Sequence, residues 1–300
     1  MNKPRRAPRR RVDGVLLLDK PPGMSSNAAL QKARWLFNAE KAGHTGTLDP
    51  MATGLLPLCF GEATKFSSTL LDADKTYEAT VKLGIVTDTC DAEGRMLATH
   101  PVNVNEAGVR AVLSRFTGAI EQVPPMHSAL KRDGVPLYEL ARKGIEVERA
   151  ARQVTIHAIE LLAWRGDSFD LRVACSKGTY IRTLAADIGS ALGCGAHLAA
   201  LRRTRVGSLD IAQAVTLETI EAKAGELRDS LLQPTDALLV DIPAMHLNHL
   251  EAARILQGQP IRRDGMPSSQ VRLFATQGFI GLGEVSEDGW LKPKRLIATV

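Results

Sequence analysis

This sequence has few cysteines, only three tyrosines and no long apolar run. It contains no C-x-x-C pair, so neither a disulfide framework nor a zinc site is expected; the four cysteines are Cys59, Cys90, Cys175 and Cys194. No H-E-x-x-H motif occurs, and His246 with His249 fits the start of a helix better than a metal pair. The apolar run 15–18 is too short for a signal-peptide core, and no run is long enough to span a bilayer. We therefore expect a cytoplasmic protein without a metal or redox cofactor.

Positive charge is concentrated at the N-terminus. The 300 residues include 38 Lys and Arg against 33 Asp and Glu, and six of these cations fall among the first eleven residues. Without them the balance is 32 against 33, so the rest of the chain is nearly neutral. A proline-spaced basic arm of this kind, residues 1–12, is typical of a flexible tail that touches polyanions weakly or serves solubility alone.

A second basic segment runs from residue 172 to 206. It sets six Lys and Arg against one carboxylate, Asp187. The six are Arg172, Lys177, Arg182, Arg202, Arg203 and Arg205. Such a local excess predicts a phosphate-facing surface.

The apolar pattern predicts a mixed α and β chain. Strands are indicated over 14–20, 75–83, 154–164 and 169–174, and helices over 25–37, 106–116, 137–143 and 179–193. Ser25 or Ser26 is expected to cap the first helix. Alternation over 75–83 places Tyr77, Ala79, Val81 and Leu83 on one face, and the acidic turn after it indicates antiparallel pairing. We expect the class α+β, with a mixed, largely antiparallel sheet flanked by helices.

The segment 124–149 interrupts this pattern. It reads PPMHSALKRDGVPLYELARKGIEVER and holds three prolines, two turn glycines and many charges. Such a segment is expected to leave the sheet as a large excursion, and an excursion of this kind could grip a ligand.

The segment 43–57, GHTGTLDPMATGLLP, sets one carboxylate, Asp49, in a glycine-punctuated loop. Its glycines allow close approach of the backbone to a ligand, and Pro50 biases Asp49 toward an extended conformation. A second interpretation is that Asp49 caps a short helix that begins at Pro50. A cap does not require the neighbouring His44 and three threonines, which favours a reactive carboxylate. The two interpretations are compatible.

Arg182 lies in the first turn of the helix expected over 179–193. The helix macrodipole disfavours a cation there by roughly 0.3 to 1 kcal/mol, so an anionic partner is expected rather than an Arg hydrated at the surface. Asp49 is the partner we expect, and the ion pair would keep it ionised by lowering its pKa. Tyr77 fits either a half-buried sheet aromatic or a ring that stacks on a base.

Several blocks of the chain resemble the bacterial tRNA pseudouridine-55 synthases, the TruB-type family. They are GVLLLDKPPGMSSN, GHTGTLDPMATGLLPL around Asp49, DKTYEA around Tyr77, SKGTYIRTLAADIG around Arg182 and LRRTRVG around Leu201. The resemblance runs nearly end to end, and LFATQGFIGLGEV with GWLKPKRL is similar to the small PUA-like β domain that ends such enzymes. It implies a basic flexible arm over 1–12, a catalytic domain with an inserted RNA-gripping loop over 13–246, and a PUA-like C-terminal domain over 247–300.

The resemblance also implies the roles of individual residues. Asp49 is expected as the catalytic aspartate, Arg182 as its ion-pair partner and Tyr77 as the ring stacked on the target uracil. Further substrate-binding residues are expected to be His44, which would admit or hold the nucleotide, and Tyr180 and Leu201, which would form walls of the pocket.

The implied reaction breaks the N1 to C1′ bond of uridine 55 in the T loop of tRNA, turns the uracil and rejoins it through C5. It needs no cofactor and no guide RNA, and we expect a monomer. The target nucleotide would be flipped out of the RNA, at a cost of a few kcal/mol that stacking and backbone contacts offset. Asp49 could attack C1′ or remove a sugar proton to give a glycal, and the sequence does not separate these routes.

An alternative of another class is a tRNA-binding folding chaperone with secondary or no catalysis. The presence of Asp49, Tyr77 and Arg182 favours the enzyme. One departure from the family pattern is His127 in PPMHSALK, where a tyrosine or phenylalanine is expected. It concerns packing from the inserted loop and not the catalytic residues.

Overall fold

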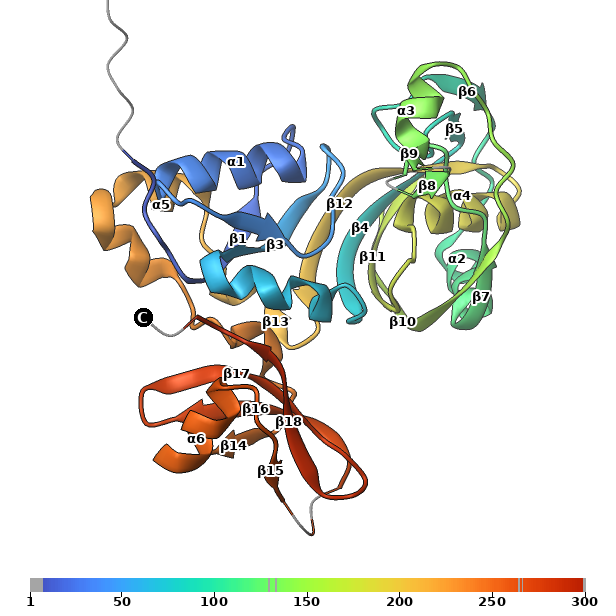
Figure 1. Cartoon of the computed structure of the whole chain (residues 1–300). Coiled ribbons are helices and arrows are strands. Elements are labelled where there is room, and N and C mark those ends of the chain that lie inside the picture. The colour runs from blue at the N-terminus through green and yellow to red at the C-terminus, as the bar shows by residue number, and fades with distance from the viewer. Residues whose placement is uncertain (1–7, 129, 133, 264, 266, 299–300) are drawn as a thin grey trace, which may run out of the picture.

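The computed structural model describes residues 8–128, 130–132, 134–263, 265 and 267–298. Its larger part is built on a nine-stranded sheet in the order β1-β3-β12-β4-β11-β10-β7, with β2 beside β3 and β13 beside β12 (Figure 1). The strands are β1 (Gly14–Lys20), β2 (Ala42–His44), β3 (Thr53–Phe60), β4 (Lys75–Leu83), β7 (Gly118–Gln122), β10 (Arg152–Trp164), β11 (Ser168–Cys175), β12 (Ala196–Val206) and β13 (Leu209–Asp210). β12 pairs in parallel with β3 and antiparallel with β4, and the other pairings are antiparallel. The expected mixed, largely antiparallel sheet is confirmed.

Both faces of the sheet are covered, and β1 shows why its sequence is apolar throughout. Leu16 and Leu18 belong to the main core, which the helices cover, whereas Val15 and Leu17 belong to a second core on the opposite face. Helices over the first face are α1 (Ser26–Leu36), α2 (Glu106–Leu113), α4 (Ile181–Ala191) and α5 (Leu217–Ala222). The 3-10 helix η1 (Gly61–Leu70) packs into the second core. A strand buried on both faces needs a continuous apolar run rather than alternation.

Several local predictions are confirmed at single residues. Helix α1 begins after Ser25, whose Oγ accepts a hydrogen bond from the backbone nitrogen of Ala28 at 3.1 Å. On β4, Ala79, Val81 and Leu83 are buried in alternation. The acidic turn joins β5 (Ile85–Thr87) to β6 (Met96–Thr99), which pair antiparallel with each other, whereas β4 itself pairs with β11 and β12.

The segment between β7 and β10 leaves the sheet, as predicted. It forms the short hairpin β8 (Lys131–Arg132) and β9 (Val135–Pro136), followed by α3 (Leu137–Arg142). Figure 1 shows it standing above the half of the sheet that holds β10 and β11.

The C-terminal part is a separate five-stranded sheet with one helix, α6 (His249–Leu256). Its strand order is β14-β16-β17-β18-β15, and the strands are β14 (Ala244–His246), β15 (Ile261–Arg262), β16 (Ser269–Ala275), β17 (Gly278–Val285) and β18 (Trp290–Leu296). This β-rich unit has its own core. His249 does begin a helix, but His246 ends β14, so the sequence expectation is right for one histidine only.

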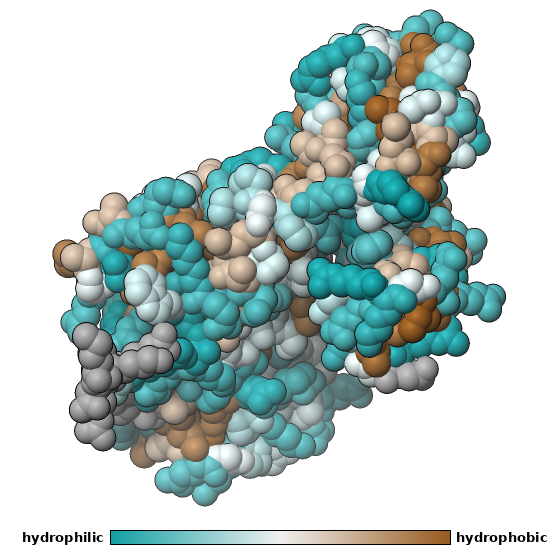
Figure 2. Space-filling view, turned by 90° about the horizontal axis from the view of Figure 1, so that it is seen from above, coloured by the Kyte–Doolittle hydropathy of each residue, from teal (hydrophilic) through white to brown (hydrophobic). Residues whose placement is uncertain are grey.

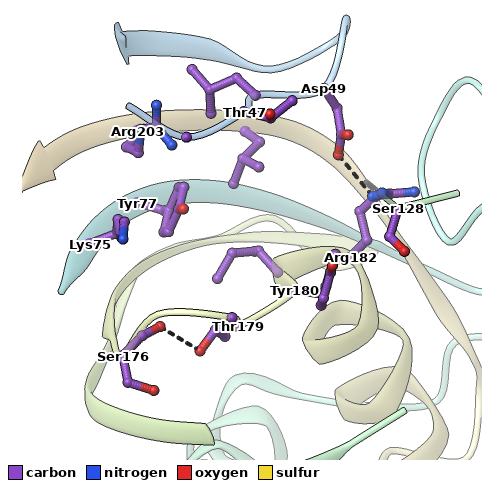
Figure 3. Close-up of a pocket in the computed structure, with 15 residues that line it drawn as sticks. Thr47, Asp49, Lys75, Tyr77, Ser128, Ser176, Thr179, Tyr180, Arg182 and Arg203 are labelled. Atoms are coloured by element: carbon purple, nitrogen blue, oxygen red, sulfur yellow. Dashed lines mark hydrogen bonds and ion pairs between the residues drawn. The ribbon is translucent and has the colours of Figure 1, made fainter. Parts of the chain in front are cut away.

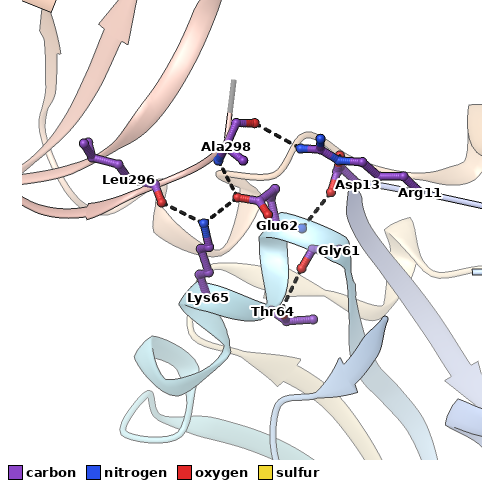
Figure 4. A network of polar contacts seen from close by, with 8 residues as sticks. All are labelled: Arg11, Asp13, Gly61, Glu62, Thr64, Lys65, Leu296 and Ala298. Carbon is purple, nitrogen blue, oxygen red and sulfur yellow. Dashed lines mark hydrogen bonds and ion pairs between the residues drawn. The ribbon is translucent and has the colours of Figure 1, made fainter. Parts of the chain in front are cut away.

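The two parts meet at a junction that we define by η1, residues 11–13 and the chain end 296–298. Phe66 of η1 packs against Phe279 of β17, with ring centroids 5.5 Å apart. Around them Lys65 donates to the carbonyl of Leu296, and Glu62 accepts from the backbone nitrogen of Ala298 (Figure 4). Figure 1 shows the C-terminal unit lying under the half of the sheet that contains β1 and β3.

Of the predicted basic arm, residues 1–7 lie outside the described residues. Residues 10–12 are packed on the body rather than free. Arg10 pairs with Asp229 at 2.5 Å, and Val12 is buried. The packed body therefore begins before the residue 13 at which we expected it.

On the face shown in Figure 2, apolar side chains are scattered in small groups between polar ones. None of the helices in the described ranges combines the length and apolar character that a bilayer crossing requires.

Candidate active site

A cavity of about 270 Å³ opens beside β4 and β12, near the N-terminus of α4 (Figure 3). Five of the six predicted site residues line it: Asp49, Tyr77, Tyr180, Arg182 and Leu201. Asp49 comes from a loop, Tyr77 and Leu201 come from the strands β4 and β12, and Tyr180 and Arg182 lie at the N-terminus of α4. The structure thus brings together the side chains that the sequence motifs single out.

Asp49 lies in the loop between β2 and β3. The backbone nitrogen of Ala52 donates to the carbonyl of Asp49 at 3.1 Å, and β3 follows at Thr53 without a helix. The helix-cap interpretation of Asp49 is therefore wrong. Its backbone carbonyl closes a tight turn instead, which leaves the carboxylate free to point into the cavity.

Two buried side chains hold this loop in place. Ser26 Oγ accepts from the backbone nitrogen of Leu48 at 2.8 Å and donates to its carbonyl at 3.0 Å. Lys20, which is fully buried, donates to the carbonyls of Met24 and Pro50. Burial lowers the pKa of Lys20 to about 8, although Asp49 opposes this. The residues on either side of Asp49 are thus both anchored.

Glycine is required at position 54, where β3 and β12 approach closely. Gly54 has φ of +99°, and a Cβ atom there would lie 2.3 Å from the carbonyl oxygen of Arg203. A larger residue would push β3 away from β12, the strand that contributes Leu201 and Arg203 to the cavity wall.

Arg182 is the centre of an ion-pair network at one end of the cavity. Its Nε lies 3.0 Å from Asp49 Oδ2, so the predicted pair is confirmed, and its Nη1 lies 3.4 Å from Asp91 Oδ2. Nη2 donates to the carbonyl of His127 at 2.6 Å. The side chains of Arg182 and Asp91 are each only 5% exposed. Two carboxylates thus offset a cation in the first turn of α4, where the macrodipole opposes it.

Sequence reasoning missed Asp91. It stands in the acidic turn TDTCDAEG, which we interpreted only as a turn. The only indication in the sequence was that Arg182 needs an anionic partner. That requirement was already met by Asp49 and did not point to a second carboxylate.

The pKa of Asp49 is raised, although an ion pair alone would lower it. Burial is the largest cause, and nearby Asp91 adds to it, whereas Arg182 and Lys20 oppose both. The expectation of a lowered pKa is therefore wrong. It considered the charge of Arg182 but not the loss of water around the buried carboxylate. Asp49 is a carboxylate that is held in place but destabilised as an anion.

Tyr77 and Tyr180 are the two tyrosines that line the cavity. Tyr77 is half-buried on β4, as the plainer interpretation predicted, and it also faces the cavity. Tyr180 precedes α4, and its backbone nitrogen and carbonyl are both hydrogen-bonded to the side chain of the buried Gln122, at 3.0 and 3.3 Å. Burial raises the pKa of both phenols, so both are neutral at physiological pH.

His44 is not among the residues that line the cavity. It lies on β2, opposite Leu58 of β3, and its Nδ1 is buried without a hydrogen-bond partner. Burial lowers its pKa, and Arg203 lowers it further. A neutral imidazole therefore stands behind the loop that carries Asp49.

The second basic segment is less positive than its local count of charges indicates. Most of its cations are paired with carboxylates: Arg172 with Glu78 and Glu160, Lys177 with Asp72, Arg182 with Asp49 and Asp91, Arg202 with Asp19, and Arg205 with Asp210. A local count of charges omits the carboxylates that the sheet brings from elsewhere, and the phosphate-facing surface stays a prediction.

Among the described residues, no group of three or more histidine, cysteine, aspartate or glutamate side chains is placed to hold a metal ion.

Three family models match the chain along its length. Residues 34–181 match the N-terminal domain of the TruB family pseudouridylate synthases. Residues 182–240 match the tRNA pseudouridylate synthase B C-terminal domain, and 243–297 match the C-terminal model of pseudouridine synthase II TruB.

Curated proteins of similar sequence have one name in common. A tRNA pseudouridine synthase B of Azoarcus sp. (strain BH72) is 64% identical over 295 residues, which are 98% of each chain. Another, of Dechloromonas aromatica (strain RCB), is 59% identical over 96% of each chain.

Solved structures share the fold at lower identity. A chain in the crystal structure of a Cbf5-Nop10-Gar1 complex superposes with a TM-score of 0.71 at 27% identity, over 96% of this chain and 84% of that one. A chain in the archaeal box H/ACA sRNP Nop10-Cbf5 complex gives a TM-score of 0.68 at 26% identity, over 94% of this chain and 85% of that one.

Proposed function

This chain belongs to the TruB family of pseudouridylate synthases, and we propose that it isomerises uridine 55 in the T loop of transfer RNA to pseudouridine. Near-full-length relatives named tRNA pseudouridine synthase B support transfer RNA as the substrate. The observation that carries the assignment of residues is the single cavity in which Asp49, held by Arg182, lies with Tyr77.

Asp49 acts on the sugar of the flipped nucleotide. It attacks C1′ or removes a sugar proton to give a glycal, and in either route the carboxylate must be ionised and aimed. Arg182 holds one of its oxygens, Oδ2, and the anchored loop fixes its backbone. The raised pKa makes the anion more basic than that of an exposed aspartate, which favours proton removal and nucleophilic attack alike.

The bonds balance without any external electron carrier. The N1 to C1′ bond breaks with its electron pair on N1, and the uracil turns within the cavity. A bond from C5 to C1′ then forms as the bond from Asp49 to C1′ breaks or, in the glycal route, as Asp49 returns the proton to the sugar. C5 loses its hydrogen as a proton, and N1 gains a proton. Because the product is an isomer of the substrate, the reaction as proposed uses no cofactor.

The cavity walls hold the base while it turns. Tyr77 stacks on the uracil, and Tyr180 and Leu201 confine it on other sides. Stacking on an aromatic ring contributes about 1 to 3 kcal/mol per base, which is comparable with the cost of flipping one nucleotide out of a stack. His44, behind the Asp49 loop, supports the loop as the nucleotide enters.

Binding of the T-arm stem-loop extends beyond the cavity. We propose that the segment 124–149, which contributes Ser128 to the cavity wall, grips the RNA. We place the start of the PUA-like domain near residue 243, because β14 already pairs within the C-terminal sheet. We further propose a cytoplasmic monomer that acts without a guide RNA.

The test is release of tritium from a T-arm stem-loop that carries 5-tritiated uridine at the target position. Wild type should release it, and Asp49→Asn should not, while its affinity for the stem-loop stays within several-fold. Asp187→Asn is the matched control, because Asp187 is also a partly buried carboxylate with a raised pKa but does not line the cavity. Release by Asp49→Asn would refute the assignment of Asp49. Tight binding without release by wild type would favour the chaperone.

A further inference from the structure

Arg203 is a buried cation in the cavity wall. It lies on β12, directly opposite Tyr77 of β4 and Gly54 of β3. Side chains opposite each other on neighbouring strands share a face and have their Cβ atoms about 5 Å apart. Arg203 is only 2% exposed and lines the cavity together with Tyr77 (Figure 3).

No carboxylate within the described residues forms an ion pair with Arg203. Its Nε donates to the carbonyl of Leu55 at 2.8 Å, and its Nη2 is buried without a hydrogen-bond partner. Its neighbours on the same strand differ, because Arg202 pairs with Asp19 and Arg205 with Asp210. A buried charge without a counter-charge destabilises a fold, so it needs another reason to be there.

The charge of Arg203 acts on several groups around the cavity. Burial is the main cause that lowers the pKa of Lys20, His44 and Lys75, and the charge of Arg203 lowers these pKa values further. It also opposes the rise in the pKa of Tyr77. The cavity therefore has a cationic end at Arg203 and a carboxylate end at Asp49, which Figure 3 shows on opposite sides.

We infer that Arg203 is a positioning residue for the isomerisation: it holds the ring of Tyr77 in the cavity and gives that end a fixed positive charge. The inference rests on the proposed function and extends it. When the N1 to C1′ bond breaks, the electron pair leaves with the uracil, which becomes an anion against the ring of Tyr77. A preorganised cation beside that ring stabilises the anion until C5 bonds to C1′ and the C5 proton leaves.

The fold keeps the guanidinium from relaxing toward solvent. β12 lies between β3 and β4, and the close approach at Gly54 fixes its backbone. The bond from Nε to the carbonyl of Leu55 then sets the direction of the side chain. Arg203 cannot swing out to find a counter-ion, so its charge remains at the cavity.

Two substitutions separate charge from geometry. Arg203→Met keeps the length and apolar volume of the side chain and removes the charge. Arg203→Lys keeps the charge but loses the guanidinium fork. Arg205→Met is the matched control, because Arg205 lies two residues along the same strand and is paired with Asp210 at the surface. Thermal unfolding of each variant shows whether it is folded.

The first readout is turnover of the stem-loop. Arg203→Met should lower kcat about 100-fold, the size of effect seen when one preorganised donor is removed from an active site, with KM within threefold. The kcat of Arg203→Lys should be at least about tenfold higher than that of Arg203→Met, because the charge is restored. Arg205→Met should leave kcat unchanged. A kcat for Arg203→Met within threefold of wild type would overturn the inference.

The second readout does not depend on activity. The chain has only three tyrosines, so protein labelled with ring-¹³C tyrosine gives few signals, and Tyr77→Phe assigns those of Tyr77. The Tyr77 signals should shift and broaden in Arg203→Met and stay unchanged in Arg205→Met. Unchanged signals in both would refute the positioning role. If wild type releases no tritium, the proposed function fails, and the Tyr77 signals still decide whether Arg203 holds the ring.

Discussion

The cavity and the domain junction use charged side chains in opposite ways. At the junction, burial tends to raise the pKa of Glu62, but hydrogen bonds from Lys65 and from the backbone of Ala298 outweigh it, so the pKa is lowered (Figure 4). In the cavity, burial raises the pKa of Asp49 and the nearby cations do not compensate. The comparison teaches that ionisation of the junction carboxylate stabilises the fold, whereas ionisation of the cavity carboxylate destabilises it.

The signs follow from linkage between proton binding and folding. The pKa of Glu62 is lower in the folded than in the unfolded chain. Its ionisation therefore contributes to the unfolding free energy in full above the unfolded pKa, and this contribution is lost as pH falls through the folded pKa. The pKa of Asp49 is higher in the folded chain. Its ionisation therefore lowers the unfolding free energy, an effect that is absent at low pH and fully present above the folded pKa. The anionic form of Asp49 is thus maintained at the expense of stability.

The largest expected effect is that of Arg182→Met. It removes the cation from two carboxylates, Asp49 and Asp91, and we expect about 3 to 5 kcal/mol less unfolding free energy, because buried charges lose their partner. Tritium release should fall at least about 100-fold in protein that remains folded. Denaturant unfolding and single-turnover release measure the two effects separately. Retained turnover would contradict the role of the pair.

Arg272→Met is the matched change outside the cavity. Arg272 of β16 is also partly buried, pairs with Asp236 at 2.8 Å and donates to the carbonyl of Ile242 at 2.8 Å. We expect about 1 to 3 kcal/mol less unfolding free energy, because Asp236 and a carbonyl lose their donor. Single-turnover release should be unchanged. A loss of turnover as large as that of Arg182→Met would remove the distinction between the two regions.

Glu62→Gln tests the junction alone. It keeps an acceptor for the backbone of Ala298 but weakens the bond with Lys65, so we expect about 1 kcal/mol less unfolding free energy at pH 7. The difference from wild type should shrink as pH falls through the acidic range. Lys65→Met is the control, because it removes the same pair from the other side, together with the bond to Leu296. A difference that does not depend on pH would mean that the charge of Glu62 is not the cause.

The smallest expected effect is on the stability of Asp49→Asn. Since ionisation of Asp49 costs stability, the variant should unfold at an equal or slightly higher temperature than wild type at pH 7, and the gain should vanish at acidic pH. Wild-type turnover should also fall on acidification at a higher pH than an ordinary aspartate would give, because the active anion is lost sooner. Destabilisation by Asp49→Asn at pH 7 would contradict the comparison.

What could be predicted from the sequence has local causes. The apolar run of β1, the Ser25 cap of α1 and the alternation of β4 each depend on residues close together in the chain. The pair of Arg182 with Asp49 was also predictable, because a cation in the first turn of a helix needs an anion and the glycine-punctuated loop 43–57 supplies one candidate.

Other properties of the site depend on strand order. β12 lies between β3 and β4, and this places Arg203 opposite Tyr77, 126 positions earlier in the chain, and next to Gly54. The same arrangement brings Asp19 to Arg202, and the fold brings Asp91 to Arg182. No local pattern encodes these distances, so the local excess of cations could not show that most of them are paired.

The sequence by itself therefore determined the apolar run of β1, the cap of α1, the alternation of β4 and the family, and it singled out Asp49 as the candidate reactive carboxylate. Only the tertiary structure decided which charges are paired, that Arg203 is buried without an ion pair among the described residues, and that the pKa of Asp49 rises rather than falls. The reason is physical: propensity and helix dipoles act within a few residues, whereas desolvation and ion pairing depend on everything that the fold packs around a charge.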